Sequence, residues 1–493
     1  MTDRLTVPEN RIRAANAHPI RHDGEWVVYW MTALRRTRSN FALQHARDWA
    51  RKLKKPLVIL EGLRIHYRWA SERMHRFVIE GMRDNAAACR ETPAVYYPYV
   101  EPKAGQGSGL IAALAKRACL VVTDDYPCFF HPHMIEAIKD RMAARLELVD
   151  GNCLMPLSAG DRTFTVAHSY RRFMQKTLPK FLDESPELQP LGKQATRDIP
   201  HLKELPQAIT RRWRPADLQD LLRSGGLDDL AIDHSVKPIQ IEGGQEAAGK
   251  LMRSFIRRYL NQYDEDRNHP DKQATSRLSG HMHFGHVSPH ELFWELMHAL
   301  EWNPSKLSKP NGKVEGFWNV GRSAEAFLDQ LLTWREIGFN MCYREPNYDR
   351  YESLPEWAQV TLAEHARDKR PRLYTAEQLD RAQTYDPIWN AAQRQLVRDG
   401  CIHNYLRMLW GKKILEWSPS PQVALDIMID LNNKYAIDGR DPNSYSGIFW
   451  VLGRYDRAWG PERQIYGKIR YMTSDSTARK VRLKEYLQEY ATF

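Results

Sequence analysis

HNYLRMLWGKKILEW, residues 403–417, shows what kind of interior the carboxyl-terminal half of this chain has. Read as an α-helix, it places His403, Arg407, Trp410, Ile414 and Trp417 on one side, at spacings of four, three, four and three residues. An arginine and two indoles are unusual on the face of an ordinary core helix, because a buried cation needs a partner. The pattern therefore predicts a helical domain with a specialised interior.

The helical pattern continues through most of this half of the chain. Apolar residues recur at helical spacing from Gln245 onward, and residues 327–340 (FLDQLLTWREIGFN) are typical of a helix. Asp386-Pro387 starts another helix, which Gly400 ends. Residues 430–450 (DLNNKYAIDGRDPNSYSGIFW) read instead as a polar loop. We therefore expect an all-α domain.

Tryptophan and basic residues are concentrated in the same half. Ten of the fifteen tryptophans lie after residue 250, and an indole is bulky and carries a polar N–H, so this density needs a reason. Between Arg440 and Arg482, nine Lys and Arg residues stand against four Asp and Glu, with Tyr and Trp interleaved. Basic residues mixed with aromatic ones indicate nucleic-acid binding. Charge alone leaves a solvated basic surface equally open.

The amino-terminal part alternates short apolar strands with helices. Strand-like runs occur at 26–30, 56–60, 94–99 and 120–123, with helical segments at 40–53 and 69–91. This alternation predicts an α/β domain with a parallel, Rossmann-like sheet covered on both faces. The expected segments are a tail (1–20), the α/β domain (21–165), a connector rich in Pro and Gly (166–245) and the helical domain (246–493).

The bulk composition is that of an ordinary soluble protein. The chain has 493 residues, of which 42% are hydrophobic and 27% charged, and its net charge is +11. No run approaches the roughly 18 apolar residues of a membrane span. The amino terminus lacks an apolar signal region, and the six cysteines form no CxxC pair. We therefore expect a cytoplasmic protein without a zinc or disulfide framework.

Three short motifs have both a chemical and a structural interpretation. TSRLS (275–279) suits a phosphate or pyrophosphate, although such a stretch is more often a loop with a helix cap. HMHFGH (281–286) offers three histidines, but no Cys, Asp or Glu lies among them, so we predict polar packing and no metal. The glycines at 105, 107 and 109 follow a strand at GxGxG spacing, for which a plain turn is the better interpretation.

Taken together, these stretches resemble the photolyase/cryptochrome family, and specifically its second class of cyclobutane pyrimidine dimer photolyases. The resemblance begins at GEWVVYWMTALRRTRSNFAL and includes YPYVEPKAGQGSGL and VVTDDYP. It is most specific in YREPNYDRYESLPEWA, YDPIWNAAQRQLV, RMLWGKKILEW, LNNKYAIDGRDPNSYSGI and YGKIRYM. These matches run over nearly the whole chain.

The resemblance implies light-driven repair of pyrimidine dimers in DNA, with FAD bound in the helical domain. It also implies a carbon–carbon lyase that works without net redox change. The α/β domain of such proteins can hold a light-harvesting pigment, often a deazaflavin of the 8-HDF type. We accordingly expect a monomer whose partner is damaged DNA with the dimer flipped out of the helix, associated with the nucleoid when bound. No membrane partner is expected.

The resemblance also implies roles for individual residues. Arg407 and Asp438 are expected to pair beside the flavin ring, with Asn432 near its N5 atom, and Trp410, Trp389 and Trp417 to carry electrons inward from a tryptophan at the surface. The implied FAD-binding residues are Tyr263, Thr275, Ser276, Leu278, Ser279, Arg335, Arg407, Asn432, Asp438 and Asp441. The implied substrate-binding residues are Gln330, Trp334, Asn404, Met408, Trp450, Arg454 and Arg470, with Arg457, Arg463 and Lys468 as further phosphate contacts.

Three positions depart from the family pattern. Gln330 stands where a glutamate usually contacts the dimer, Asn404 replaces the glycine usual in this class, and the loop VLGRYDRAWGPERQ is rearranged. These departures leave open a flavin photoreceptor with weak or lost repair, or action on the related (6-4) lesion. A third alternative, a basic DNA-binding protein that keeps FAD only structurally, is disfavoured by the predicted tryptophan relay.

Overall fold

The structure is a computed structural model that describes residues 5–272 and 274–492. These residues form two compact units. The α/β unit contains the chain up to Ala159, Lys180–Met252 and Leu278–Leu296, and the helical unit contains Gly160–Pro179, Arg253–Arg277 and the chain from Met297 onward. The units cut the chain differently from the four predicted segments, because 278–296 joins the α/β unit and most of the predicted connector does too. This division by contacts does not test the boundaries of the four predicted segments, which remain predictions.

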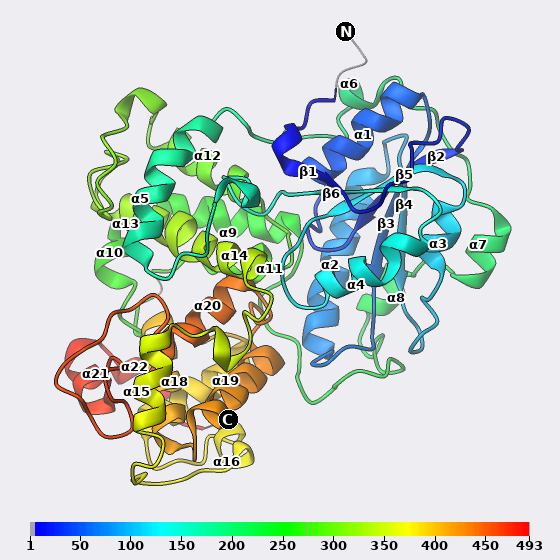
Figure 1. The fold of residues 1–493 in the computed structure, drawn as a ribbon. Helices are drawn as coiled ribbons and strands as arrows, with labels where there is room; N and C mark the ends of the chain where they lie inside the picture. The colour runs from blue at the N-terminus through cyan, green and yellow to red at the C-terminus, as the bar shows by residue number, and fades with distance from the viewer. Residues whose placement is uncertain (1–4, 273, 493) are drawn as a thin grey trace. The chain divides into compact units, whose positions relative to one another are not determined.

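The α/β unit is built on one six-stranded sheet in the order β1-β6-β5-β2-β3-β4 (Figure 1). Its strands are β1 (Ile12–Ala14), β2 (Trp26–Met31), β3 (Leu57–Leu63), β4 (Val95–Val100), β5 (Ala118–Asp124) and β6 (Arg145–Val149). Only β1, an edge strand, runs antiparallel to its neighbour. The predicted α/β fold is confirmed, while β1 and β6 were not predicted.

Alternate residues of β2 belong to two different apolar cores, one on each face of the sheet. Trp26, Val28 and Trp30 pack on one face. Val27, Tyr29 and Met31 pack on the other, against α1. Successive side chains of a strand point to opposite faces, so a strand that is apolar throughout is buried on both sides.

Helices cover both faces of this sheet. Those of the α/β unit are α1 (Phe41–Leu53), α2 (Glu72–Cys89), α3 (Leu110–Ala115), α4 (His131–Ile138), α6 (Lys193–Thr196), α7 (Gln207–Arg212), α8 (Leu218–Leu222) and α11 (Ser279–His283). Two further helices, α9 (Gln245–Arg258) and α12 (Pro289–Ala299), cross the division between the units. Within the described residues, no helix combines the length and the apolar character needed to cross a lipid bilayer.

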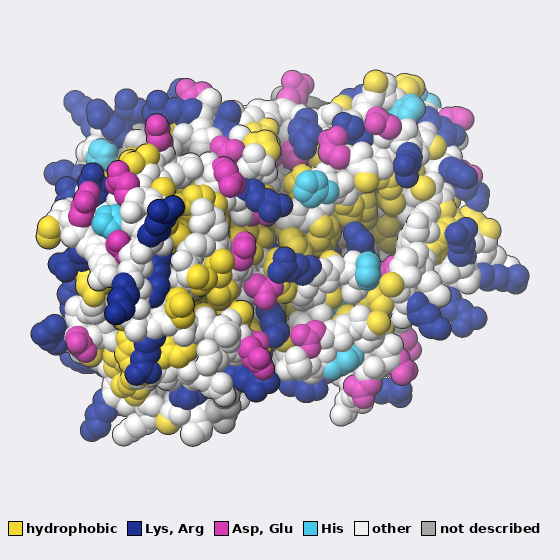
Figure 2. All heavy atoms as spheres, turned by 60° about the horizontal axis from the view of Figure 1, so that its bottom comes forward, with side chains coloured by type: hydrophobic (Ala, Val, Ile, Leu, Met, Phe, Trp, Pro, Cys, Tyr) yellow, Lys and Arg dark blue, Asp and Glu magenta, His cyan; other side chains and the backbone are white. Residues whose placement is uncertain are grey.

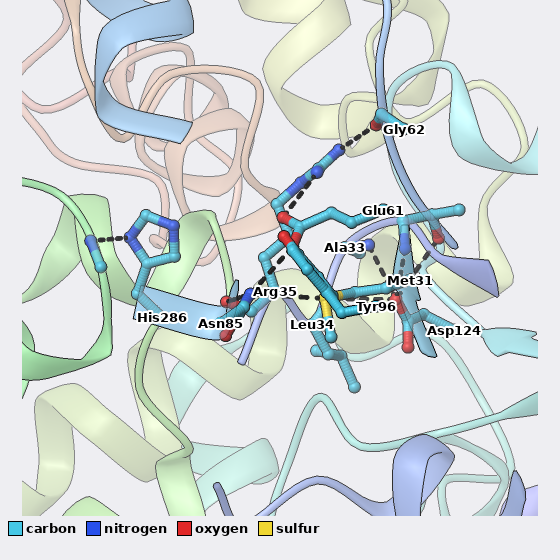
Figure 3. A network of polar contacts seen from close by, with 12 residues as sticks. Met31, Ala33, Leu34, Arg35, Glu61, Gly62, Asn85, Tyr96, Asp124 and His286 are labelled. Atoms are coloured by element: carbon cyan, nitrogen blue, oxygen red, sulfur yellow. Dashed lines mark hydrogen bonds and ion pairs between the residues drawn. The ribbon is translucent and has the colours of Figure 1, made fainter. Parts of the chain in front are cut away.

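A buried polar network occupies the carboxyl ends of the parallel strands (Figure 3). Asp124, at the end of β5, accepts the backbone N–H groups of Thr32, Ala33 and Leu34 at 2.8–3.0 Å. Glu61, on β3, pairs with Arg35 at 3.0 Å. Ligands of doubly wound sheets usually bind at this edge. Here these two carboxylates fix the loop after β2 to β5 and to β3.

Two histidines of HMHFGH, His281 and His286, are buried and make polar contacts, as predicted, but they belong to the α/β unit and not to the helical domain in which the sequence placed them. His281 Nε2 donates to the Glu242 carbonyl at 3.0 Å, and His286 Nδ1 accepts the N–H of Gly244 at 2.9 Å. Burial lowers the pKa of His281 to about 4, so its ring is neutral at physiological pH. Among the described residues, no three His, Cys, Asp or Glu side chains gather as metal ligands.

The glycines of the GxGxG stretch form a turn that the chain's own Trp213 closes. Gly109 has φ +88° and precedes α3, and a Cβ there would lie 3.3 Å from the Trp213 ring. The Trp213 N–H donates to the Gln106 carbonyl at 2.9 Å. These contacts agree with a plain turn.

The helical unit consists of helices joined by loops, the longest of which connects α20 to α21. They are α5 (Ala167–Thr177), α10 (Tyr263–Asp266), α13 (Arg322–Leu328), α14 (Arg335–Arg344), α15 (Glu356–Glu364), α16 (Ala376–Asp380), α17 (Pro387–Asp399), α18 (Asn404–Trp417), α19 (Pro421–Tyr435), α20 (Pro442–Val451), α21 (Ser474–Lys480) and α22 (Lys484–Glu489). A π-helical segment, Asp329–Trp334, joins α13 to α14. Short 3₁₀ turns occur in both units. Three belong to the α/β unit: Glu9–Arg11, Lys139–Arg141 and Leu157–Ala159. The others are Leu178–Phe181, Leu260–Gln262, Pro304–Lys306 and Tyr351–Ser353.

The prediction of a polar loop at 430–450 is wrong for most of its length. Helix α19 extends to Tyr435 and α20 begins at Pro442, so only six residues lie between them. Asp441 caps α20 by accepting the Asn443 N–H at 2.8 Å, with Pro442 at the first helical position. This cap is a sequence signal for a helix start, and the density of polar residues obscured it.

Candidate functional site

Helix α18 exposes one polar edge and buries the rest. Its predicted helical character over 403–417 is confirmed for Asn404–Trp417. Asn404 is exposed and Arg407 and Met408 are half-buried, whereas Leu409 and Trp410 are buried. The helix therefore presents a cation and a thioether on its accessible side and an indole on its inner side.

The predicted pairing of Arg407 with Asp438 is confirmed. The closest approach is 3.2 Å, between Arg407 Nη2 and Asp438 Oδ1, and the two side chains remain 18% and 15% exposed. Both contacts to Asp438 come from Nη2. Among the described residues, the other guanidinium N–H groups of Arg407 have no protein acceptor. A guanidinium presents five donors, so this one retains capacity for a ligand.

Asn432 lies on α19 and is held in place by α20. Its Nδ2 donates to Ser444 Oγ at 2.7 Å and to Asn433 Oδ1 at 3.3 Å. The amide is buried, and these bonds fix its orientation. Asp441, predicted as a cofactor ligand, is buried, and one of its carboxylate oxygens caps α20.

The three predicted relay tryptophans lie together in the order Trp410, Trp389, Trp417. The Trp389 N–H donates to the carbonyl of Trp410 at 3.0 Å. The rings of Trp389 and Trp417 meet edge to face with 5.6 Å between centroids. The Trp410 N–H donates to Gln393 Oε1 at 2.9 Å. Helix α17 carries Trp389 and begins at its Asp386 cap, as predicted.

The prediction that this array starts from a surface tryptophan is wrong. Trp410, Trp389 and Trp417 are 2%, 0% and 0% exposed. Instead, the Trp417 ring contacts two tyrosines, Tyr374 at 5.3 Å and Tyr385 at 5.6 Å between centroids. Tyr385 is 52% exposed. The aromatic contacts thus reach solvent through a phenol, a step that tryptophan spacing alone could not reveal.

Gln330 and Trp334 lie on the π-helical segment, and both are half-buried. The Trp334 N–H donates to Asp329 Oδ2 at 3.1 Å. Asp329 is in turn paired with Arg171 of α5 at 2.6 Å. Neither Asp329 nor Arg171 was predicted as a site residue, although Asp329 directly precedes Gln330.

Trp450, on α20, is flanked by two cations. Lys412 Nζ lies 5.2 Å from the centre of its ring and the Arg470 guanidinium 5.5 Å from it. Arg470 also pairs with Asp456 at 2.7 Å. Lys412 is fully buried, donates to the Val451 carbonyl at 2.5 Å, and has a pKa that burial lowers to about 7. A charged residue in the middle of an apolar helix was not recognised in the sequence as a partner of Trp450.

One predicted DNA contact, Arg454, is not available to DNA. Its side chain is 2% exposed and donates to the carbonyl and the hydroxyl of Ser353. A cation sealed in this way cannot reach a phosphate. By contrast, Arg457, Arg463 and Lys468 are exposed. Figure 2 shows one face of the molecule, on which Lys and Arg side chains are frequent along the margin of the helical unit and hydrophobic ones gather inside that margin.

The TSRLS stretch is divided between the two units, with Thr275 to Arg277 in the helical unit and Leu278 and Ser279 in the α/β unit. Thr275 and Ser279 are exposed and Ser276 is half-buried. Arg277 has φ +56°, an uncommon conformation for a residue with a side chain. Leu278 is buried, and Ser279 begins α11.

Tyr263 and Arg335, the other two predicted cofactor residues, are buried. The Tyr263 ring packs edge to face with Phe255 and Phe327, and burial raises its pKa. The guanidinium of Arg335 lies 4.4 Å from the centre of the Phe339 ring. These contacts describe packing and leave the cofactor roles as predictions.

Comparison with known proteins gives near full-length relatives. Deoxyribodipyrimidine photo-lyases from Methanothermobacter thermautotrophicus, Potorous tridactylus and Oryza sativa subsp. japonica are each 33% identical to this chain. The matches cover 97%, 93% and 94% of this chain, and 97%, 80% and 86% of the respective relatives. No family model matches the chain.

A solved structure shares the fold. It is a bacterial class III photolyase from Agrobacterium tumefaciens, which superposes with a TM-score of 0.66 over 95% of this chain and 86% of that one. Its sequence identity is only 16%, so this likeness concerns the fold alone.

Proposed function

The chain belongs to the photolyase/cryptochrome family, and from this premise we propose that it is a deoxyribodipyrimidine photo-lyase, which uses light to split cyclobutane pyrimidine dimers in DNA. The observation that carries the proposal is the buried cluster of Trp410, Trp389 and Trp417. In it the Trp389 N–H bonds the Trp410 backbone carbonyl, the rings of Trp389 and Trp417 meet, and Trp417 contacts the exposed Tyr385. A protein that only binds DNA has no use for a buried aromatic path from solvent to its interior. An enzyme driven by photoreduction does.

FAD is the proposed cofactor, and the donor set in the helical unit fits it. Arg407 keeps free N–H groups, Thr275 and Ser276 offer hydroxyls, and the amide of Asn432 is fixed in orientation. These residues would hold FAD, which when bound would supply light-driven one-electron chemistry to the dimer. The positive charge of Arg407 favours an anionic ring nearby, and Asp438 orients that charge.

The remaining cofactor residues have supporting roles in this proposal. Thr275, Ser276, Leu278 and Ser279 would bind the pyrophosphate of FAD, with Tyr263 and Arg335 nearby. Asp441 would act through the start of α20, which it caps and which holds Asn432. For the α/β unit we propose a deazaflavin of the 8-HDF type as antenna, which the absorption spectrum of the purified protein tests directly.

The substrate-binding residues share partial exposure. Trp334, Trp450, Gln330 and Met408 are half-buried and Asn404 is exposed, whereas Trp389, Trp410 and Trp417 of the same unit are buried. Photolyases extrude their target from the duplex, and an indole face then stacks on it for about 1–3 kcal/mol per base. Arg457, Arg463, Lys468 and Arg470 would contact the phosphates. We propose that the protein acts as a cytoplasmic monomer that associates with the nucleoid.

Gln330 favours a second candidate function. Its amide can donate and accept hydrogen bonds but has no carboxyl proton and no charge. If that loss abolishes dimer splitting, the chain is a flavin photoreceptor of the same family. Gln330→Glu should then restore repair, and in the favoured function it should only alter the repair yield.

Repair of a dimer-bearing oligothymidine tests the proposal. The purified protein is photoreduced with a thiol, mixed with the oligonucleotide, and followed by recovery of base absorbance under blue light. Recovery that depends on light supports the lyase. A flavin that photoreduces without any recovery identifies the photoreceptor, and a protein that holds no flavin after reconstitution contradicts both.

A further inference from the structure

The indole N–H of Trp334 is held by a buried carboxylate. Trp334 Nε1 donates to Asp329 Oδ2 at 3.1 Å. Asp329 is buried, whereas Trp334 is half-buried. One edge of the ring is therefore fixed from the protein interior while part of the ring stays accessible.

The π-helical segment makes this contact possible. Asp329 and Trp334 are five residues apart and stand at the two ends of the segment. In an α-helix, residues five apart are separated by about 140° around the axis, at 3.6 residues per turn. A π-helix closes its hydrogen bonds between residues five apart and brings them onto one side. The extra residue in this turn thus aligns the carboxylate with the indole, and π-helical turns occur frequently at functional sites.

Arg171 fixes the carboxylate in turn. Its Nε lies 2.6 Å from Asp329 Oδ1 and its Nη2 3.1 Å from Oδ2, a bidentate pair. A third bond, from Nη1, reaches the Gly312 carbonyl at 3.3 Å. Arg171 is also buried. A buried ion pair seldom stabilises a fold by itself. Because this pair also accepts the N–H of an accessible indole, we look for its role in the position of that ring.

We propose that Asp329, anchored by Arg171, is a positioning residue that holds the Trp334 ring ready for the damaged base. This inference rests on the proposed function, in which Trp334 stacks on the dimer. A side chain that is already fixed loses less conformational freedom on binding, so its contact with the ligand is tighter. Undamaged DNA, whose bases stay in the duplex, does not use the ring and gains nothing from the alignment.

The primary test is Trp334→Phe, which keeps an aromatic ring and the Asp329–Arg171 pair but removes the N–H. Its matched control is Trp450→Phe, because the indole N–H of Trp450 has no partner among the described residues. Affinities for a dimer-bearing and an undamaged oligonucleotide are measured at one salt concentration, because phosphate contacts depend on salt. We expect Trp334→Phe to weaken dimer binding about tenfold, the scale of one hydrogen bond to a charged group, and Trp450→Phe clearly less.

Asp329→Asn provides the second measurement. Alone it should weaken dimer binding as Trp334→Phe does, and in the Trp334→Phe background it should add nothing. Affinity for undamaged DNA and the repair yield at saturating dimer should stay unchanged in Asp329→Asn. A purely structural role would instead lower the melting temperature and both affinities. If the two Phe variants lose equal affinity, or the effects of Asp329→Asn and Trp334→Phe add fully, the positioning role is wrong.

The proposed function fails in a different way. If the unaltered protein does not prefer dimer-bearing DNA, or if Trp334→Ala binds it normally, then Trp334 does not contact the dimer. If the preference exists and Trp334→Ala abolishes it while Trp334→Phe and Asp329→Asn keep it, only the positioning role of Asp329 is overturned.

Discussion

The helical unit uses tryptophan in two contrasting ways. The buried tryptophans, Trp389, Trp410 and Trp417, are closed off from solvent, and two of them donate their N–H to neutral oxygens. The open tryptophans, Trp334 and Trp450, are half-buried and lie against charged groups: Asp329 for the first, and Lys412 and Arg470 for the second. Lys413 Nζ also lies 5.5 Å from the centre of the Trp417 ring, so a nearby cation does not separate the two groups. They differ in exposure and in the N–H partner, which is a neutral oxygen for Trp389 and Trp410 and a carboxylate for Trp334.

The difference matches what each group is proposed to do. Electron transfer needs fixed distances between rings and exclusion of water, which close packing provides. Recognition of an extruded base needs a ring with one accessible face. The protein can then contact such a ring only on its opposite face or along one edge. Charged groups suit this task because hydrogen bonds to them and cation–π contacts are stronger than neutral contacts.

Removal of one buried tryptophan should have the largest effect. Trp410→Phe interrupts the array beside the proposed flavin, so photoreduction should fall to the level of protein without a relay, while repair by chemically reduced protein stays largely intact. Flavin absorbance under illumination measures the first and dimer repair the second. The control is Trp26→Phe, a buried tryptophan of the α/β unit. Equal loss of photoreduction and repair would contradict the division into two groups.

Removal of an open tryptophan should do the reverse. Trp334→Ala or Trp450→Ala should weaken binding of dimer-bearing DNA about ten- to hundredfold, from the loss of about 1–3 kcal/mol of stacking per base. Photoreduction should be unaffected, because neither ring belongs to the buried array. A gel-shift or anisotropy titration gives the affinity. A variant that photoreduces slowly but binds normally would show that its ring had been assigned to the wrong group.

Lys412, which lies against the Trp450 ring, should make the stability of the protein depend on pH. Burial lowers the pKa of Lys412 to about 7 from 10.5, so between these values the unfolded chain binds more protons there than the folded chain. The free energy of unfolding should therefore rise with pH across this window, by at most about 1.4 kcal/mol per unit from this group. Lys412→Met keeps the apolar stem and should flatten the dependence and stabilise the protein at acidic pH.

Urea unfolding at about pH 6.5 and about pH 8.5 measures that change. The comparison variant is Lys413→Met, since Lys413 is paired with Glu416 at 2.7 Å, which helps to raise its pKa. The slope should persist in Lys413→Met. Parallel pH profiles for the unaltered protein and Lys412→Met would refute the assignment.

The exposed end of the array should contribute least. Tyr385→Phe removes the hydroxyl of the exposed ring, but Tyr374 still contacts Trp417, so photoreduction should slow only a few-fold. Tyr374→Phe should behave similarly, and the double variant should be slower than either. Transient absorption of the oxidised aromatic residue measures the effect. An unchanged double variant would place the entry of electrons elsewhere.

Much of the fold could be predicted from local patterns. The apolar runs of β2 to β5 and the helix at Asn404–Trp417 follow from periodicity alone, because burial on both faces or on one stripe determines them. The pairing of Arg407 with Asp438 came from resemblance and from the cost of a lone buried cation. The predictions that were wrong depended on tertiary context. Arg454 was predicted to contact DNA, but in the fold its side chain is buried against Ser353.

The candidate site was less predictable than the fold for the same reason. No local pattern distinguishes the π-helical segment at Asp329–Trp334 from the α-helices around it, and therefore Asp329 was not linked to Trp334. The burial of Trp417 depends on Tyr374 and Tyr385, which lie more than thirty residues earlier in the chain. Spacing along one helix gives directions for its side chains but not the neighbours that cover them.

The division of the chain between the units has a consequence for its synthesis. Residues 278–296 belong to the α/β unit, and there the Arg36 guanidinium donates to the Gly285 carbonyl at 2.9 Å. Domains made first generally fold first as the ribosome proceeds. This α/β unit cannot complete its fold until more than half of the chain has been translated. A gene fragment that ends at the predicted boundary near residue 165 should therefore yield an insoluble product.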